Sequence, residues 1–463
     1  MNYFVRRTLS YASKARCFTS KDSSHQSKFM NPIVAQLWQQ REETRQRMMS
    51  LTDEDSDSTG SGNLQELTAR TMREGKTGSP KAQFRHPSDS KTTIDYKFST
   101  DSFLREAYRS PGNTMRFGKV LEDLDALAGN IAFHHVGNTD NLMLVTAAVD
   151  RIALKDIPVL EKDQRLSGQV TYVGSSSMEI RIQIHEVNDT KDTIAPDYWL
   201  EGYFTFVAVD PETNRPMKIP PLIPETSEER ALFELGALKA KKKKESRKNS
   251  SGQITEESLK MERRSEQLLS DAFPLLRMPS LADPNAILMD HTALSNTTIA
   301  QPQVRNLANK IFGGFLMRRA FELAFSTSYS FGGEWPQMLE VDNITFNSPV
   351  EVGDLLQFNS RVIYSLPNGG NLGDEVAIHS AKPLVMIEVE CFVMDPVKVT
   401  SRLSNRFYFT FVLPTRSNCR KVLPGTLEEA RRMVQRMVAD EEQAGLGKGY
   451  LNQYNLLNVE KKK

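Results

Sequence analysis

Apolar residues at helical spacing predict one long helix in each half of the chain. In "RFGKVLEDLDALAGNIAF", residues 116–133, apolar side chains recur every three or four positions and so share one face of a helix. The run "FLMRRAFELAFSTSY", residues 315–329, is apolar around much of its circumference. That pattern is typical of a helix buried on most sides.

Alternation of apolar and polar residues predicts strands after each helix. "MEIRIQIH", residues 178–185, has an apolar side chain at every second position and a polar one between, which predicts a half-buried strand with one face toward solvent. "MIEVEC", residues 386–391, has the same pattern. A buried helix followed by long strands indicates α+β domains in which an antiparallel sheet wraps a central helix.

Three short motifs occur twice in the same order. The pairs are "VDRI" at 149–152 and "VDNI" at 341–344, "YFTFV" at 203–207 and 408–412, and "PETSEE" at 224–229 with "PGTLEE" at 424–429. Their offsets of 192, 205 and 200 residues differ slightly, as a duplicated domain with loop insertions would produce. So long a period excludes short-repeat solenoids, and we expect the two copies to pack as a pseudo-symmetric pair.

Size and charge restrict the class of protein. A chain of 463 residues exceeds the reach of one hydrophobic core, which agrees with two domains. Its 59 basic and 58 acidic side chains give a net charge of +1, so the overall charge does not indicate a nucleic-acid partner. The three cysteines, Cys17, Cys391 and Cys419, show no metal-ligand spacing, so we expect no metal and a reducing compartment. No run approaches the roughly 18 apolar residues of a membrane-spanning helix, so we expect no integral membrane segment.

The first residues differ in composition from the rest. "MNYFVRRTLSYASKARCFTSK" is rich in arginine, lysine and serine and contains no acid. This composition predicts a mitochondrial transit peptide over residues 1–30 and a location in the mitochondrion, in the matrix. A basic tail without a targeting role is the alternative, and no cleavage site can be read.

Two segments interrupt the domains. Residues 50–90 have few large apolar groups, and "LKAKKKKESRKNSSGQ" at 238–253 indicates a solvated linker. The predicted order is a transit peptide (1–30), a flexible or poorly structured region (31–94), a first domain (95–235), a charged linker (236–284), a second domain (285–440) and a C-terminal tail (441–463).

At this point the sequence resembles a known family. "NLANKIFGGFLMRRAFELA", "VDNITFNSPVEVGDLL" and the paired "YFTFV" blocks resemble the double hot-dog acyl-CoA thioesterases, most closely the mitochondrial acyl-CoA thioesterase 9 type. The resemblance covers residues 95–235 and 285–440. It implies a tandem double hot-dog fold, hydrolysis of fatty acyl-CoA to free fatty acid and CoA, no cofactor because CoA is part of the substrate, and a homo-oligomer of pseudo-dimers, with trimers as one form.

The resemblance also implies one composite site between the two domains. The family places an Asn before one central helix and an acid within the other, which points to Asn306 and Asp125 as catalytic residues. The same counting in the opposite direction gives Ser110 and Phe321, so the reciprocal site is expected to have decayed. Glu122, three residues before Asp125, is the main competitor for the acid's role.

The glycines of "FGGF" suit a thioester carbonyl. Backbone N–H groups at the start of a helix stabilise a developing oxyanion, and glycine permits close approach. We therefore expect Gly313 and Gly314 to supply the donor, although close helix packing explains the same glycines equally well. Arg116, Lys310 and Arg318 are candidates for the CoA phosphates.

Three interpretations remain open from the sequence. The first is the thioesterase, the second a hot-dog enoyl-CoA hydratase, and the third a non-catalytic acyl-CoA-binding protein. The sequence does not decide acyl chain length, regulation by nucleotides or CoA, or whether Asp125 acts as general base or nucleophile.

Overall fold

The computed structural model describes residues 33–37, 39–40, 43, 84–137, 142–188, 193–249, 256–305, 310–346, 348–368, 382–415 and 417–442. The strands are β1 (Thr92–Tyr96), β2 (Met143–Leu154), β3 (Gln164–Val173), β4 (Ser177–Asn188), β5 (Thr193–Val209), β6 (Ala286–Leu288), β7 (Leu294–Ile299), β8 (Gln337–Phe346), β9 (Leu355–Leu366), β10 (Leu384–Asp395), β11 (Thr400–Val412) and β12 (Lys421–Leu423). The helices are α5 (Pro87–Ser90), α6 (Ser102–Ala107), α7 (Phe117–Val136), α8 (Ser227–Asn249), α9 (Glu256–Asp271), α10 (Phe273–Arg277) and α11 (Gly313–Gly332), and short 3₁₀ turns are η3 (Pro279–Leu281), η4 (Met289–Thr292) and η5 (Pro302–Val304).

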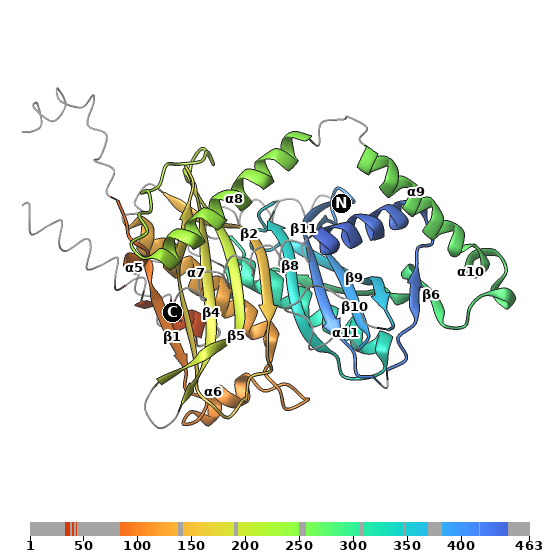
Figure 1. Ribbon diagram of the computed structural model, residues 1–463, viewed down its shortest axis with the longest axis horizontal. Coiled ribbons are helices and arrows are strands. Elements are labelled where there is room, and N and C mark those ends of the chain that lie inside the picture. Colours follow the sequence, from red (N-terminus) through yellow and green to blue (C-terminus); the bar gives the residue numbers. More distant parts are fainter. Residues whose placement is uncertain are drawn as a thin grey trace, which may run out of the picture.

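One sheet of ten strands runs through both halves of the molecule. Its order is β1-β3-β4-β5-β2-β8-β11-β10-β9-β7, and every neighbouring pair is antiparallel. Each half of this order is the mirror of the other, with β2 and β8 meeting at the centre, where Ile152 lies opposite Val341 (Figure 1). The predicted α+β tandem double hot-dog and its pseudo-symmetric pairing are therefore confirmed.

The two predicted central helices, α7 and α11, lie on the same face of the sheet and contact each other (Figure 1). Both have most of their side chains buried, since each packs against strands of its own half and against the other helix. Among the core side chains are Leu121, Leu124 and Leu127 of α7, which are fully buried. The apolar periodicity read from the sequence is thus the packing surface of these helices.

The twice-occurring "P-x-T-x-E-E" motif begins a helix in each half. Thr226 accepts a hydrogen bond from the N–H of Glu229 (3.1 Å), and the Glu229 carboxylate accepts one from the N–H of Thr226 (3.0 Å), a capping box at the start of α8. Glu429 likewise donates its N–H to Thr426 (3.2 Å), and its carboxylate accepts the N–H of Gly425 (2.7 Å), before a helix over residues 427–442. These helices cover the sheet face opposite α7 and α11 (Figure 1).

That cover corrects one expectation about the strands. "MIEVEC" was expected to have a face toward solvent, but Glu388 and Glu390 of β10 are buried. Arg432 of the C-terminal helix reaches both carboxylates, at 3.1 Å from Glu388 and 3.4 Å from Glu390. The alternating pattern is correct, and the polar face is covered by a helix rather than by water.

Two predicted segments contain more regular structure than expected. In the region 31–94, predicted as flexible or poorly structured, residues 33–37 are helical with buried Ile33, Val34 and Leu37, and α5 and β1 begin before residue 95. The charged linker 236–284 contains the end of α8 and all of α9 and α10. Its lysines are not merely solvated, because Lys239 binds Glu179 (3.2 Å) and Lys243 binds Asp150 on the sheet.

Candidate active site

Asp125 lies in the middle of α7 and is fully buried. Its Oδ2 accepts a hydrogen bond from the backbone N–H of Gly314 (2.6 Å), and its Oδ1 accepts one from Thr146 Oγ1 (3.0 Å). Gly314 is the second residue of α11 in the second half, whereas Thr146 belongs to β2 of the first. The carboxylate therefore joins the two repeated units.

Burial sets the acidity of this carboxyl group. Loss of water around Asp125 raises its pKa to about 6, although the hydrogen bonds from Thr146 and Gly314 favour the ionised form. Glu122 adds a smaller raising effect. At pH 7 to 8 the group is mostly ionised, but its pKa lies close enough to neutrality for proton transfer in both directions.

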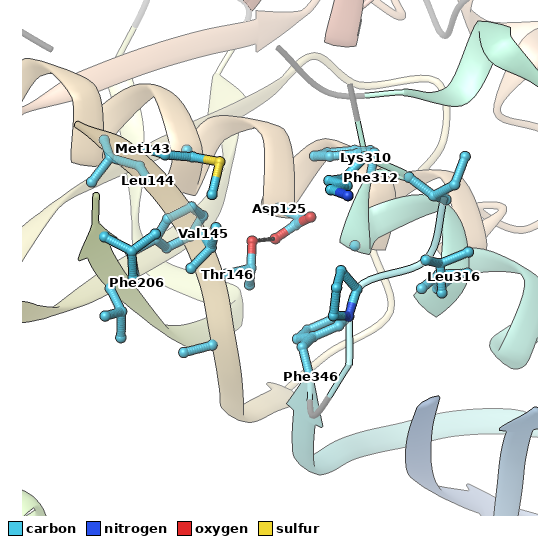
Figure 2. A pocket seen from close by; sticks show the side chains of 18 of the residues that line it. Asp125, Met143, Leu144, Val145, Thr146, Phe206, Lys310, Phe312, Leu316 and Phe346 are labelled. Carbon is cyan, nitrogen blue, oxygen red and sulfur yellow. Dashed lines mark hydrogen bonds between the residues drawn. The ribbon is translucent and has the colours of Figure 1, made fainter. Parts of the chain in front are cut away.

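A cavity of about 590 Å³ opens beside Asp125. Apolar side chains of β2, among them Met143 and Val145, flank it on one side, and Phe312 and Leu316 from the second half flank it on the other (Figure 2). Its lining is Leu37, Asp125, Ala126, Gly129, Asn130, Met143, Leu144, Val145, Thr146, Ala147, Phe206, Val207, Val209, Asn214, Lys310, Ile311, Phe312, Gly313, Leu316, Phe346, Ser348, Pro349 and Val350. Such an apolar pocket with few polar groups suits a small molecule carrying a hydrocarbon chain.

Asn130 is one of the few polar residues in this mostly apolar wall. It follows Asp125 on α7 by five residues, about 7 to 8 Å along the helix axis, and only 2% of it is exposed. Neither side-chain atom, Oδ1 or Nδ2, has a hydrogen-bond partner among the described residues. A carboxamide carries an NH2 group with two donors and a carbonyl acceptor, so this buried side chain keeps its hydrogen-bonding capacity unused among the described residues.

Gly313 and Gly314 both stand where a larger side chain would collide. A Cβ on Gly313 would lie 3.1 Å from Asp125 Oδ2, and a Cβ on Gly314 would lie 2.9 Å from the backbone oxygen of Glu122. Gly314 thus serves the close packing of α11 on α7, and its N–H is directed at Asp125. Gly313 lines the cavity itself.

The three cations predicted for CoA lie in different places. Lys310 lines the cavity beside Asp125 and pairs with the exposed Glu351. Arg116 lines a second cavity and binds Glu322 (2.6 Å). Arg318 bridges Glu122 (2.9 Å) and Glu322 (3.3 Å) between the two helices. Only Lys310 therefore shares the cavity with Asp125. Asn306 lies outside the described residues.

The two acids beside Asp125 have other partners. Glu122, the competitor named above, is held by Arg318 and lines neither cavity. Asp123 accepts hydrogen bonds from Tyr96 Oη (2.7 Å) and from Tyr108, and burial raises its pKa to about 8. Of these three acids on α7, Asp125 alone faces the cavity.

Comparison with known proteins adds independent information. Acyl-coenzyme A thioesterase 2, chloroplastic, from Humulus lupulus is 41% identical over 366 residues, which are 76% of this chain and 81% of that protein. The chain belongs to the acyl-CoA thioesterase family. Acyl-coenzyme A thioesterase 4, mitochondrial, from the same plant is 43% identical over 76% of this chain and 67% of its own length. Human acyl-coenzyme A thioesterase 9, mitochondrial, is 34% identical over 71% of this chain and 72% of its own.

Other comparisons are less informative. No protein-family model matches the chain. Among solved structures, an acyl-CoA hydrolase from Staphylococcus aureus covers 36% of this chain and 94% of its own, at 23% identity and a TM-score of 0.31, too low to support an argument about the site. The described residues of this thioesterase include no group of three or more metal-ligating side chains and no helix long and apolar enough to span a membrane.

Sequence reasoning named only Asp125, Lys310 and Gly313 among the residues that line the thioesterase's cavity, and two of the residues it missed are informative. Thr146 donates a hydrogen bond to Asp125. The sequence feature that could have identified it is the single hydroxyl within the apolar run "LMLVTAAV". Leu37 lines the cavity from the region 31–94, which was predicted to be flexible or poorly structured. No local pattern identifies Leu37, because its neighbours in space are distant in the chain.

Proposed function

We propose that this member of the family hydrolyses fatty acyl-CoA to a fatty acid and CoA at the composite site around Asp125. The observation that carries the proposal is a buried carboxylate, facing a mostly apolar cavity, that is held by the first turn of the other repeat's central helix. The cavity would take the acyl chain, and Lys310 at its edge would meet the CoA moiety.

Each side chain then has a defined part in the reaction. The Gly314 N–H and the Thr146 hydroxyl fix the orientation of the Asp125 carboxylate. Gly313, at the first position of α11, is assigned to the thioester carbonyl together with Asn306, because N–H groups there are free to stabilise an oxyanion. A second donor role for Gly314 would require its N–H to leave Asp125.

Hydrolysis of the thioester follows one of two reaction paths. In the first, Asp125 takes a proton from water, the water oxygen attacks the carbonyl carbon, the carbon–sulfur bond breaks and the proton passes to the CoA thiolate. In the second, Asp125 itself attacks, CoA leaves, and water then opens the mixed anhydride. Turnover in ¹⁸O-water distinguishes them: in the second path, water that opens the anhydride at the Asp125 carbonyl leaves ¹⁸O in that carboxylate, whereas the first path never labels Asp125.

Thiol release provides the test. Asp125→Asn should lower kcat for hydrolysis of a fatty acyl-CoA at least 100-fold, because the base or nucleophile is removed while the side-chain volume is kept. Asp123→Asn is the matched control: it changes the neighbouring buried acid, which contacts Tyr96 and Tyr108 instead of the cavity. Full activity of Asp125→Asn would contradict the proposal.

The same assay separates the alternatives. An enoyl-CoA hydratase would consume the double bond of an enoyl-CoA without releasing thiol, and a binding protein would retain acyl-CoA without turnover. Family membership favours hydrolysis.

We further propose a mitochondrial location, in the matrix, and assembly of pseudo-dimers into a larger homo-oligomer. The location is supported by the basic, acid-free first residues and by relatives named mitochondrial, although another relative is named chloroplastic. Fractionation of organelles and the mass of the purified protein in solution test the two statements.

A further inference from the structure

A second cavity, of about 1000 Å³, lies at the position related to the first by the internal repeat. A β-bridge precedes each central helix at matching positions: Arg109 pairs with Met115 before α7, and Arg305 pairs with Ile311 before α11. Their common offset of 196 residues relates Gly118 to Gly314 and Asp125 to Phe321. The first cavity uses the middle of α7 and the start of α11, and the second uses the middle of α11 and the start of α7.

The second cavity has lost the acid and its hydroxyl partner together. Phe321 stands where the repeat would place the acid, and Met338 corresponds to Thr146 by the 192-residue offset of "VDRI" and "VDNI". Both Phe321 and Met338 line this cavity. The neighbouring Glu322 is no substitute, because Arg116 (2.6 Å), Arg318 (3.3 Å) and Arg319 (3.5 Å) surround its carboxylate.

The second cavity is open although it lacks the acid. Gly118 remains a glycine, and a Cβ there would lie 3.3 Å from the Phe321 ring. Aromatic rings form its wall: Phe325 packs edge-on to Trp335 at 5.0 Å between ring centroids, and Tyr329 packs on the same indole at 5.3 Å. The wall is therefore mostly hydrocarbon and aromatic, and its charged side chains are Arg109 and the Arg116–Glu322 pair.

We propose that this second cavity binds an acyl chain without hydrolysing it. It keeps the geometry of the first cavity relative to the helices, and it replaces reactive groups with hydrocarbon surface that favours an apolar chain. The chain could arrive on acyl-CoA or as the fatty acid that the first site releases. The proposal rests on the proposed function, because the acyl ligand is taken from it.

The test counts bound ligands on the full chain. The probe is the hexadecyl thioether of CoA, which lacks a thioester and cannot be hydrolysed. We expect two equivalents per chain by equilibrium dialysis for the natural protein. Ser326→Trp and, separately, Ser330→Trp should fill the second cavity and reduce the count to one, since both serines lie on its rim. Ser280→Trp, on the exposed η3 turn, is the matched control and should keep two.

Hydrolysis at Asp125 reports that each tryptophan variant is folded, and its kcat/KM should stay within about twofold of the natural value. Hexadecanoic acid is tested as a second probe: one equivalent that Ser326→Trp removes would show that the second cavity also takes the free fatty acid, and no such binding would identify acyl-CoA as the occupant. Any of three results would overturn the inference. They are one equivalent of thioether in the natural protein, two equivalents in both cavity-filling variants, or occupation of the second site by CoA without a chain. Two equivalents with no thiol release would instead contradict the proposed function and leave the second cavity as proposed.

Discussion

At the scale of single residues, environment separates three acids that the sequence presents together. Glu122, Asp123 and Asp125 lie within one turn of α7, and such a cluster usually forms a solvated face. Here all three are buried, and their partners are an arginine, two tyrosines and a backbone N–H with a hydroxyl, respectively. Because their partners differ, the three carboxyl groups have different roles.

The raised pKa of Asp125 predicts how activity depends on pH. Hydrolysis requires the ionised carboxylate, so kcat/KM should fall about tenfold per pH unit below a pKa of about 6 and level off above it. A pH–rate profile between pH 4.5 and 8.5 measures this. A profile that stays flat to pH 4.5 would show that another group, or an unperturbed carboxyl, limits the reaction.

The same pKa predicts that Asp125 lowers the stability of the folded protein at neutral pH. The pKa of Asp125 in the folded protein lies above the ordinary value of 3.8. The protonated carboxyl group therefore stabilises the fold below pH 4, and this contribution is lost as the pH rises through about 6. The difference corresponds to about 3 kcal/mol. Asp125→Asn should therefore raise the free energy of unfolding by roughly 1–3 kcal/mol at pH 8 and have little effect at pH 4, by urea titration.

At the scale of elements, the contact between α7 and α11 determines whether the site forms. Gly314 permits this contact, because a Cβ would meet the backbone oxygen and Cα of Glu122 at 2.9 and 3.0 Å. Backbone atoms of a buried helix cannot move aside cheaply. The glycine that sequence analysis assigned to a substrate is thus also the point at which the two helices approach.

Gly314→Ala should therefore damage both stability and activity. Separation of the helices lengthens the Gly314–Asp125 hydrogen bond, and overpacking costs about 1–3 kcal/mol. We expect a loss of that size in urea unfolding and at least a tenfold loss in kcat. Gly129→Ala is the stability control, since its Cβ would lie 3.8 Å from the Phe206 ring and alanine favours the helix by about 0.5–1 kcal/mol. Equal behaviour of the two variants would refute the packing argument.

At the scale of the whole molecule, the paired strands β2 and β8 join the halves and the outer helices cover the sheet. The C-terminal helix is fixed by Arg436, which is 4% exposed and binds Asp342 of β8 and Asp440 of its own helix. Tyr364 of β9 donates a hydrogen bond to Asp440. This buried cluster connects three elements of the second half.

Arg436→Met should lower the free energy of unfolding by about 3–5 kcal/mol at pH 8, because two buried carboxylates lose their cation. The loss should shrink at pH 5, where protonation neutralises carboxyl groups whose pKa burial raises, as it does for Asp342. Arg431→Met is the control on the same helix: its partner Glu262 is also exposed, so the free energy of unfolding should hardly change. Urea titrations at both pH values decide between these outcomes.

The sequence by itself determined the elements and their duplication. Apolar periodicity and repeated motifs are local or recurrent properties of the chain, so the central helices, the strands "MEIRIQIH" and "MIEVEC" and the pairing of two like domains could be read directly. The family resemblance also pointed to Asp125, and the glycine pair pointed to Gly314; the structure joins these two residues by a hydrogen bond.

Only the tertiary structure decided which residues surround these helices, strands and site residues. Thr146 reaches Asp125 from a strand, Leu37 enters the cavity from a distant segment, and Glu388 and Glu390 are covered by a helix more than 30 residues away in sequence. These contacts depend on distances between elements, and burial, which raises the pKa of Asp125, is a property of the assembled layers. A local pattern contains neither kind of information.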